Sequence, residues 1–245
     1  MDSTLYVMGS QMDSLTQSLQ ECSTNLANVD TPGFKRLVNK FRAEYETQPA
    51  TGYGGSFSDG VSARWPTLVT GTMDLSQGAI RVTGRDLDVA IQGKGFLVVD
   101  TPAGERYTRK GRLYVSVDGE LTDGFSNPLV AAGGTLRIPA NAANVSIGRN
   151  GEVVADNVAL GQLLMVEVPQ LDKLVRDGHC LLRNTGEPAK EAVNTTLVQG
   201  ALEVSNVEPF REMVNLVDIM RYYEVSAKVM KRIDSLKDGL IQAAG

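Results

Sequence analysis

Apolar residues recur in alternating steps of three and four along the N-terminal part of the chain, with polar residues of low charge between them. The members of this stripe are Leu5, Met8, Met12, Leu15, Leu19, Cys22, Leu26 and Val29. A helix brings such positions to one face, and a narrow stripe of period 3.5 is typical of a coiled-coil seam. The pattern predicts a long N-terminal helix that ends close to Thr31, before Pro32 and Gly33.

A second stripe runs along the C-terminal part of the chain. Its members are Met213, Leu216, Met220, Tyr223, Ala227 and Met230. Ser205 or Asn206 is suited to cap this helix, and Pro209 is tolerated in its first turn. Two helices that pack separately on a central domain would usually show wider apolar faces. The heptad period therefore favours pairing of the two helices as a coiled coil.

Between the two helical segments lie almost all of the glycines and prolines, at intervals typical of turns. Alternating apolar residues and the dipeptides Asp118-Gly119 and Asn150-Gly151 predict tight hairpins, and Gly93-Lys94-Gly95 sits in a hairpin-like pattern. The fold class expected is a mainly β, antiparallel central domain flanked by long terminal helices. The expected division is an N-terminal helix over 1–33, an extended linker over 34–75 that includes the Gly/Ser-rich stretch 52–60, a β domain over 76–200 and a C-terminal helix over 201–245.

Composition and charge narrow the classes of function. The formal net charge is -5, and basic residues are spread along the chain, which argues against a nucleic-acid partner. No apolar run reaches the roughly 18 residues of a membrane-spanning helix. No basic segment leads into an apolar run at the N-terminus, so a cleavable secretory signal is not expected.

Residues that could carry chemistry are sparse. The only histidine is His179, next to one of two cysteines, Cys180, and in an extended segment these neighbours would point to opposite faces. No calcium-loop spacing surrounds the turn carboxylates, and the spacing around Gly93 does not fit a phosphate-binding loop. The sequence predicts no catalytic site, no metal site and no cofactor, which leaves a hydrolase using Cys180 or an Asp pair as a weaker alternative.

One segment carries a recognisable signature. It consists of Asn25, Leu26, Ala27 and Asn28, followed by Thr31, Pro32, Gly33 and Phe34. This segment resembles the helix-to-turn hallmark of the rod and hook family of flagellar axial proteins, and residues 77–111 and 199–224 match that family in the same order. The modest length is most like the proximal rod members, with the distal rod members as the alternative.

The resemblance implies a structural subunit of the flagellar basal-body rod, located in the periplasm, that polymerises through its terminal helices into the drive shaft for motility. It implies as partners other copies, neighbouring rod proteins and the flagellar type III export apparatus, which would account for the missing secretory signal. The two apolar stripes would then be assembly seams. A β-domain binding module presented on a coiled coil is the less favoured alternative.

Overall fold

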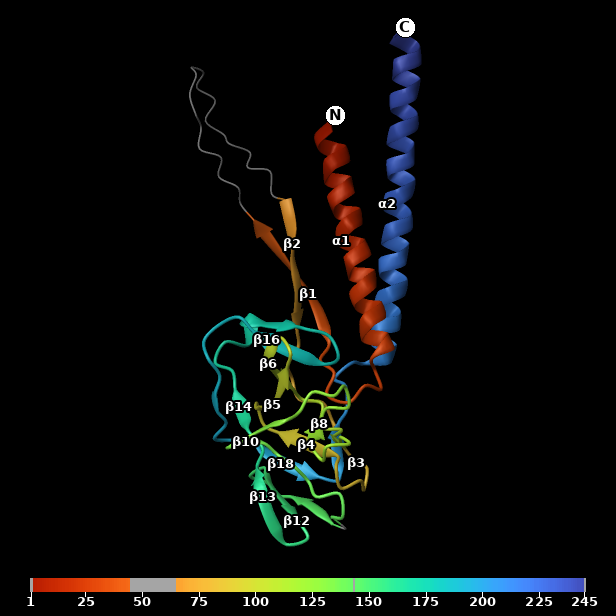
Figure 1. Cartoon of the computed structure of the whole chain (residues 1–245). Coiled ribbons are helices and arrows are strands. Elements are labelled where there is room, and N and C mark those ends of the chain that lie inside the picture. The colour runs from red at the N-terminus through yellow and green to blue at the C-terminus, as the bar shows by residue number, and fades with distance from the viewer. Residues whose placement is uncertain (1, 45–64, 143, 245) are drawn as a thin grey trace, which may run out of the picture. The chain divides into compact units, whose positions relative to one another are not determined.

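The computed structural model describes residues 2–44, 65–142 and 144–244 (Figure 1). The chain separates into two compact units. The first unit contains residues 1–26, 37–72 and 209–245, and the second contains residues 27–36 and 73–208. The Gly/Ser-rich stretch 52–60 lies outside the described residues.

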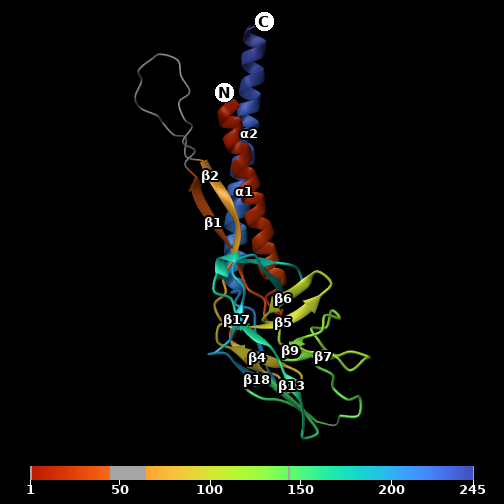
Figure 2. The ribbon, with the colours of Figure 1, turned by 60° about the vertical axis from the view of Figure 1, so that its left-hand side comes forward.

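The first unit consists of two helices and a strand pair. Helix α1 spans Asp2–Ala27 and helix α2 spans Pro209–Ala244. Strands β1 (Leu37–Glu44) and β2 (Trp65–Met73) pair with each other. Figures 1 and 2 show α1 and α2 side by side in both views. Among the described residues, no helix is both long enough and apolar enough to cross a membrane.

The prediction that α1 and α2 pair as a coiled coil is wrong. In a coiled coil the seam residues are buried as knobs in holes. Beyond Glu212, none of the α2 side chains that the structure describes is buried, and the predicted seam members Met213 and Met220 are 46% and 49% exposed. The half-buried apolar side chains of α2 are those of Leu216, Ile219, Ala227, Met230 and Ile233.

The physical reason lies in the distribution of residues around both helices. Apolar residues of α2 extend around most of the helix, so the positions that share the heptad face are not set apart as a narrow apolar seam. On α1, the buried side chains include those of Ser18, Cys22 and Asn25, and two of these three are polar. Helix α2 therefore lacks the narrow apolar seam that would match the stripe of α1 in a coiled coil.

The second unit is built from short strands, and every strand pairing recorded in it is antiparallel. Its strands are β3 (Ile80–Val82), β4 (Val89–Gln92), β5 (Phe96–Thr101), β6 (Gly104–Thr108), β7 (Tyr114–Val115), β8 (Leu121–Thr122), β9 (Val130–Ala131), β10 (Gly134–Thr135), β11 (Val145–Ile147), β12 (Glu152–Ala155), β13 (Val158–Gln162), β14 (Met165–Glu167), β15 (Leu174–Arg176), β16 (Leu181–Asn184), β17 (Lys190–Glu191), β18 (Thr196–Gln199) and β19 (Ala201–Glu203). One 3-10 turn, η1 (Leu171–Lys173), precedes β15.

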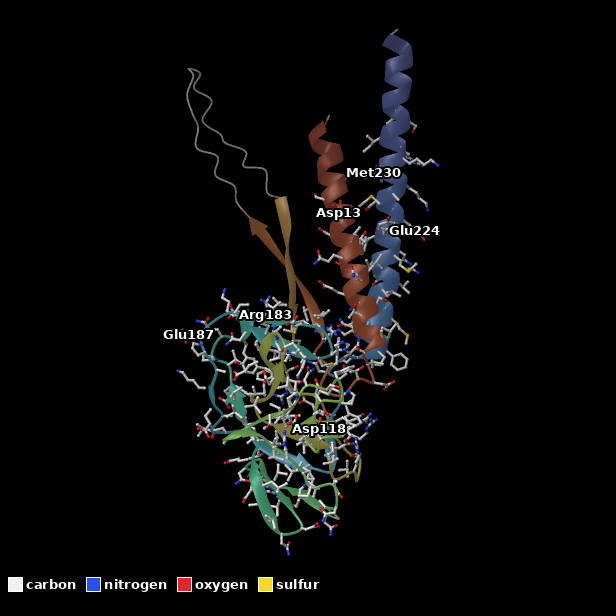
Figure 3. The ribbon with its side chains drawn as sticks, viewed as in Figure 1. Asp13, Asp118, Arg183, Glu187, Glu224 and Met230 are labelled. Carbon is white, nitrogen blue, oxygen red and sulfur yellow. The ribbon has the colours of Figure 1, made fainter. Side chains whose placement is uncertain are left out.

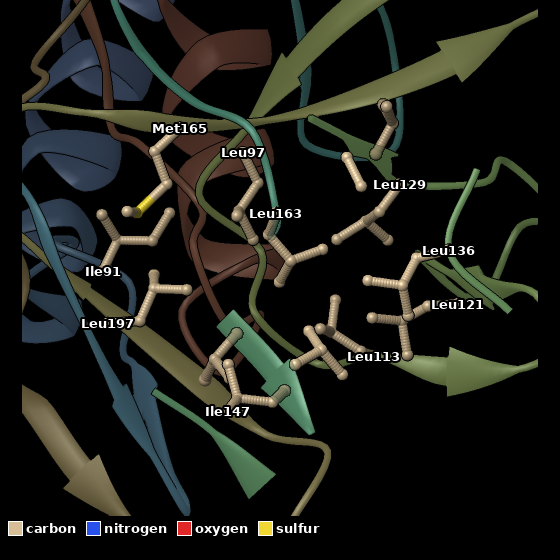
Figure 4. Close-up of a cluster of buried hydrophobic side chains, with 14 of the residues drawn as sticks. Ile91, Leu97, Leu113, Leu121, Leu129, Leu136, Ile147, Leu163, Met165 and Leu197 are labelled. Atoms are coloured by element: carbon tan, nitrogen blue, oxygen red, sulfur yellow. The ribbon is translucent and has the colours of Figure 1, made fainter. Parts of the chain in front are cut away.

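A six-stranded sheet, in the order β15-β16-β6-β5-β14-β17, carries apolar side chains on both faces. Leu97 and Val99 of β5 join the larger core cluster, whereas Phe96 and Val98 join a second cluster with Leu182. Alternate residues of a strand point to opposite faces. Because both faces of β5 are buried, the sequence of β5 begins with the continuous apolar run Phe96–Val99. Figure 4 shows the larger cluster, in which Leu97 and Leu163 lie between Met165 and Leu129.

Two of the predicted hairpins are confirmed and one is wrong. Strands β7 and β8 pair across Asp118-Gly119, and β11 and β12 pair across Asn150-Gly151. Gly93-Lys94-Gly95 does not close a hairpin, because β4 pairs with β18 while β5 pairs with β6 and β14. The bend at Gly93 instead passes the chain from one sheet to another.

Candidate assembly site

Asn25, the first residue of the predicted signature, is buried in the first unit. Its side chain accepts a hydrogen bond from the backbone N–H of Leu37 at 2.8 Å and donates one to the carbonyl of the same residue at 2.9 Å. The amide also donates to Oε2 of Glu212 at 3.4 Å, and the Cys22 thiol donates to the Glu212 carbonyl at 3.0 Å. Asn25 thus joins the end of α1 to the start of β1 and to the first turn of α2.

The remainder of the signature forms a tight turn in the second unit. Thr31 donates through its backbone N–H to the Asn28 carbonyl at 3.1 Å and through its hydroxyl to Oδ1 of Asn28 at 3.1 Å. Gly33 has φ of 71°, and a Cβ at this position would come within 2.5 Å of the Arg109 backbone. Phe34 is almost completely buried. Only glycine satisfies both the left-handed backbone and the close approach at position 33.

A buried cluster of three charges lies beside this turn, and we call Lys35, Arg109 and Glu203 the junction cluster. The Lys35 ammonium donates to Oε1 of Glu203 at 2.6 Å, and Nε of Arg109 donates to Oε2 at 2.8 Å. The backbone N–H of Gly78 donates to Oε1 at 2.8 Å, and that of Gly33 donates to the Glu203 carbonyl at 2.9 Å. One residue near the end of the second unit therefore holds the signature turn.

The charges of the junction cluster are strongly desolvated, and further hydrogen bonds offset that cost. Burial lowers the pKa of Lys35, and the Glu203 carboxylate opposes this shift. Lys35 also donates to the Ser76 carbonyl at 2.5 Å. Arg109 donates to the carbonyls of Ile91, Gly93 and Gly95 at 2.9 to 3.2 Å, which fixes the bend between β4 and β5. Buried ions are tolerated when they are paired and fully hydrogen-bonded in this way.

No sequence pattern relates the members of the junction cluster to one another, because they are separated by up to 168 residues. The available signal was Glu203 in the apolar run Ala201-Leu202-Glu203-Val204, where a charged side chain in a short strand needs a partner. The partner's identity, however, depends on the tertiary fold.

Asn206 was predicted as a possible helix cap and has a different role. Its Oδ1 accepts the backbone N–H of Arg36 at 2.7 Å, and its amide donates to the Asp74 carbonyl at 2.8 Å. The Ser205 hydroxyl accepts the backbone N–H of Val207 at 3.3 Å. Helix α2 begins only at Pro209, so the prediction that Ser205 or Asn206 caps it is wrong. Both side chains organise the segment that precedes the helix.

Helix α2 presents apolar side chains to solvent along the face away from its half-buried residues. We call this set the α2 apolar surface: Phe210, Met213, Val214, Val217, Met220, Tyr222, Val225, Val229 and Leu236, each at least 41% exposed. At about 100° per residue, these positions share one broad side of the helix. Figure 3 shows the helix with its side chains, among them Glu224 and Met230. Exposed charged side chains, among them Arg221, Glu224 and Lys228, lie between these positions, and this many exposed apolar side chains on one helix favours an interaction surface.

The predicted seam residues are divided by the structure. Met213 and Met220 belong to the α2 apolar surface, whereas Leu216, Ala227 and Met230 are half-buried and Tyr223 is 37% exposed. On the N-terminal side, Met8, Met12, Leu15, Leu19, Leu26 and Val29 are half-buried, and Cys22 is buried. The side chain of Leu5 lies outside the described residues.

A pocket of about 290 Å³ opens beside the signature turn in the second unit. Its lining includes Lys110, Phe125, Arg176, His179 and Cys180. His179 and Cys180 have φ of 41° and 62°, so they form a turn and both line the pocket. The prediction that these neighbours point to opposite faces of an extended segment is wrong. Within the described ranges, His, Cys, Asp and Glu side chains form no group of three that could hold a metal ion.

Two family models match the chain. Residues 90–155 match the flagellar hook protein FlgE/F/G D1 domain, and residues 198–243 match the C-terminal domain of the flagellar basal-body rod FlgEFG proteins. The first match covers β5 to β12 and the second covers β19 and nearly all of α2.

Curated relatives extend the similarity over the full chain. The chain is 34% identical to the flagellar basal-body rod protein FlgF of Caulobacter vibrioides, over 100% of this chain and 99% of the relative. It is 32% identical to FlgF of Salmonella typhimurium, over 96% and 95%. It is 31% identical to FlgG of Bacillus subtilis, over 97% of each. The chain belongs to the family of flagellar basal-body rod proteins, of the FlgF type.

Proposed function

We propose that the chain is a structural subunit of the flagellar basal-body rod and that it contacts neighbouring subunits through the α2 apolar surface. The observation that carries this proposal is the exposure of apolar side chains along α2, on the side away from its half-buried residues. Burial of one large apolar side chain is worth roughly 1.5 to 3 kcal/mol before the costs of association. Several such side chains together favour association with another chain.

Assembly of a rod requires a contact between subunits that repeats from one subunit to the next without closing into a ring. A heterologous contact, in which one surface meets a different surface of the next copy, produces a helical filament when the rotation does not close. The α2 apolar surface and the polar outer side of α1 differ in chemistry, so they suit this arrangement. The partners are other copies of the chain and neighbouring rod proteins in the periplasm, reached through the flagellar export apparatus.

A non-catalytic role agrees with the chemistry of the most reactive groups. Burial raises the pKa of the Cys180 thiol, and Arg176 and Lys110 oppose this shift only in part. The thiolate is the nucleophilic form, so this thiol is poorly suited to attack a substrate at neutral pH. A hydrolase using Cys180 is therefore the weaker alternative, and the distal rod type is the nearer alternative within the family.

The proposal is tested by placing charges on the α2 apolar surface in a strain that lacks its own copy of the protein. Val214→Asp with Val225→Asp introduces two carboxylates at positions 61% and 59% exposed. Matched controls are Val193→Asp and Val117→Asp, at exposed valines of the second unit. Motility and recovery of the chain in isolated basal bodies are measured. The proposal requires loss of both with the α2 variant and retention with the controls, and equal behaviour of the two sets contradicts it.

A further inference from the structure

The pocket beside the signature turn contains two cations, Lys110 and Arg176, that have no carboxylate partner in the part of the chain that the structure describes. The Lys110 ammonium donates one hydrogen bond to the Asp123 carbonyl at 3.0 Å, and its Nζ lies 4.3 Å from the centre of the Phe125 ring. Cζ of Arg176 lies 4.5 Å from the centre of the Phe34 ring. Among the described residues, neither side chain forms a salt bridge with an acidic group.

Two acidic side chains close to these cations form their hydrogen bonds and ion pairs with other groups: Asp123, whose carbonyl accepts from Lys110, and Asp177, which follows Arg176 in the sequence. The buried Asp123 carboxylate accepts the backbone N–H of Phe125 at 2.8 Å and the side-chain amide of Asn127 at 2.9 Å. Asp177 pairs with Arg106, with Nε and Oδ2 separated by 2.5 Å. Both carboxylates therefore have hydrogen-bond or ion-pair partners other than Lys110 and Arg176. The two cations lie at the wall of the pocket.

One wall of the pocket is aromatic. The His179 ring lies 4.0 Å from the Phe125 ring between centroids, so the two rings form one aromatic side. The left-handed backbone at His179 and Cys180 holds both residues at the pocket. Two cations beside an aromatic side favour a carboxylate over a neutral or cationic group.

We propose that this pocket binds an acidic side chain of a neighbouring subunit in the rod. The proposal rests on the proposed function for the identity of the partner. The occupant is a second copy of this chain, which the proposed helical assembly places beside each subunit, and an acidic side chain complements the charges of Lys110 and Arg176. A carboxylate of one copy thereby neutralises the Lys110 and Arg176 pair of the next. This contact adds a polar, orienting interaction to the apolar contacts of α2.

Cys180 lines the pocket and provides a direct probe of its charge. In a chain carrying Cys22→Ser, Cys180 is the only thiol, and its reaction with an anionic aromatic disulfide is compared with that of a neutral analogue. Both reagents react with the same thiolate of Cys180, so the fraction of Cys180 that is ionised cancels in the ratio of the two rates. We expect Lys110→Gln with Arg176→Gln to lower this ratio by roughly three- to tenfold, since the local cations concentrate the anion.

Arg183→Gln is the matched control for this measurement. Arg176 pairs with Leu182 across β15 and β16, so the adjacent Arg183 points to the other face of the sheet and is exposed (Figure 3). Its loss should leave the rate ratio unchanged. A ratio near one in the unmodified pocket, or an equal decrease with Arg183→Gln, overturns the inference that the pocket attracts anions.

The occupant is tested in basal bodies that contain the Cys22→Ser chain. We expect Cys180 to be labelled at least about tenfold more slowly in the rod than in the free chain, and Lys110→Gln with Arg176→Gln to restore part of the labelling. Val193→Cys, in a chain that also carries Cys180→Ser, reports general access of the reagent to the second unit. Equal labelling of Cys180 in rod and free chain overturns this proposal alone, whereas failure of the chain to enter basal bodies counts against the proposed function.

Discussion

The ammonium of Lys35 lies 2.6 Å from Oε1 of Glu203, and both side chains are almost wholly excluded from solvent. Residues 28–36 follow α1 directly in the sequence, and Glu203 is the last residue of β19, the final strand before α2. This ion pair therefore fastens the beginning and the end of the second unit to each other. The chain segments leading to both terminal helices depend on its integrity.

Replacing Glu203 by Gln should strongly destabilise the chain. The substitution leaves the charges of Lys35 and Arg109 buried without a counter-charge, which costs about 3–5 kcal/mol in comparable cases. The free energy of unfolding in urea measures this loss. Glu191→Gln, at an exposed position of β17, serves as the control and should change stability by less than about 0.5 kcal/mol. Similar values for both variants would contradict the structural role of the junction cluster.

Gly33→Ala should cost more than Gly178→Ala, although the two glycines have almost the same φ, 71° and 72°. Both variants incur the strain of a left-handed backbone, about 1 kcal/mol or more. Only at Gly33 does the added Cβ also collide with the Arg109 backbone, whereas nothing lies within 4 Å of the Cβ position at Gly178. Thermal unfolding compares them directly. A smaller loss at Gly33 than at Gly178 would show that the close approach is absent in solution.

Asn25→Ala should destabilise the first unit by about 1–3 kcal/mol. The variant removes the partner of both the backbone N–H and the carbonyl of Leu37. Hydrogen exchange at the Leu37 amide should accelerate, because its acceptor is gone. Gln20→Ala, at an exposed position of α1, is the control. An unchanged Leu37 exchange rate would mean that Asn25 does not hold β1.

The stability of the chain should fall with rising pH in the alkaline range, in part because of Cys22. Burial, with a further contribution from the neighbouring Glu212, raises the pKa of the Cys22 thiol from 9.0 to about 12. Because the folded pKa lies above the unfolded one, the stabilisation is complete below pH 9.0 and is lost as pH rises towards about 12.

Cys22→Ser removes this titration and keeps a hydroxyl that can donate to the Glu212 carbonyl. The variant should therefore lose stability less steeply over the same pH range, by at most about 1.4 kcal/mol per pH unit. Urea unfolding at a series of alkaline pH values measures both slopes. Parallel slopes would mean that the thiol is equally acidic in the folded and unfolded chain.

Local patterns predicted the two terminal helices and two hairpins of this fold, but they did not predict the partners of more distant segments or the β1–β2 strand pair, which lies in the predicted linker. The scarcity of glycine and proline predicted helices that the structure places at Asp2–Ala27 and Pro209–Ala244, and Asp118-Gly119 predicted the β7–β8 hairpin. Each of these signals lies within a few neighbouring residues. The junction cluster could not be predicted because no local pattern relates Lys35 to Glu203.

The error in the predicted helix pairing has a similar origin. Met213 and Met220 fit a heptad step, yet Val214 and Val217 on the same helix are also apolar and exposed. A period identifies the positions that share a face and does not identify what covers that face. The assignment of the predicted seam residues to subunit contacts, and the division of the chain at residues 33, 75 and 200, remain predictions.

The central claim is that the α2 apolar surface is buried between subunits in the assembled rod. Hydroxyl-radical footprinting tests it most directly by comparing oxidation of Met213, Met220 and Tyr222 in the free chain and in isolated basal bodies, with the exposed Tyr114 of the second unit as reference. The three α2 side chains should be strongly protected in the rod relative to Tyr114. Equal oxidation of Met213, Met220 and Tyr222 in both states would contradict it.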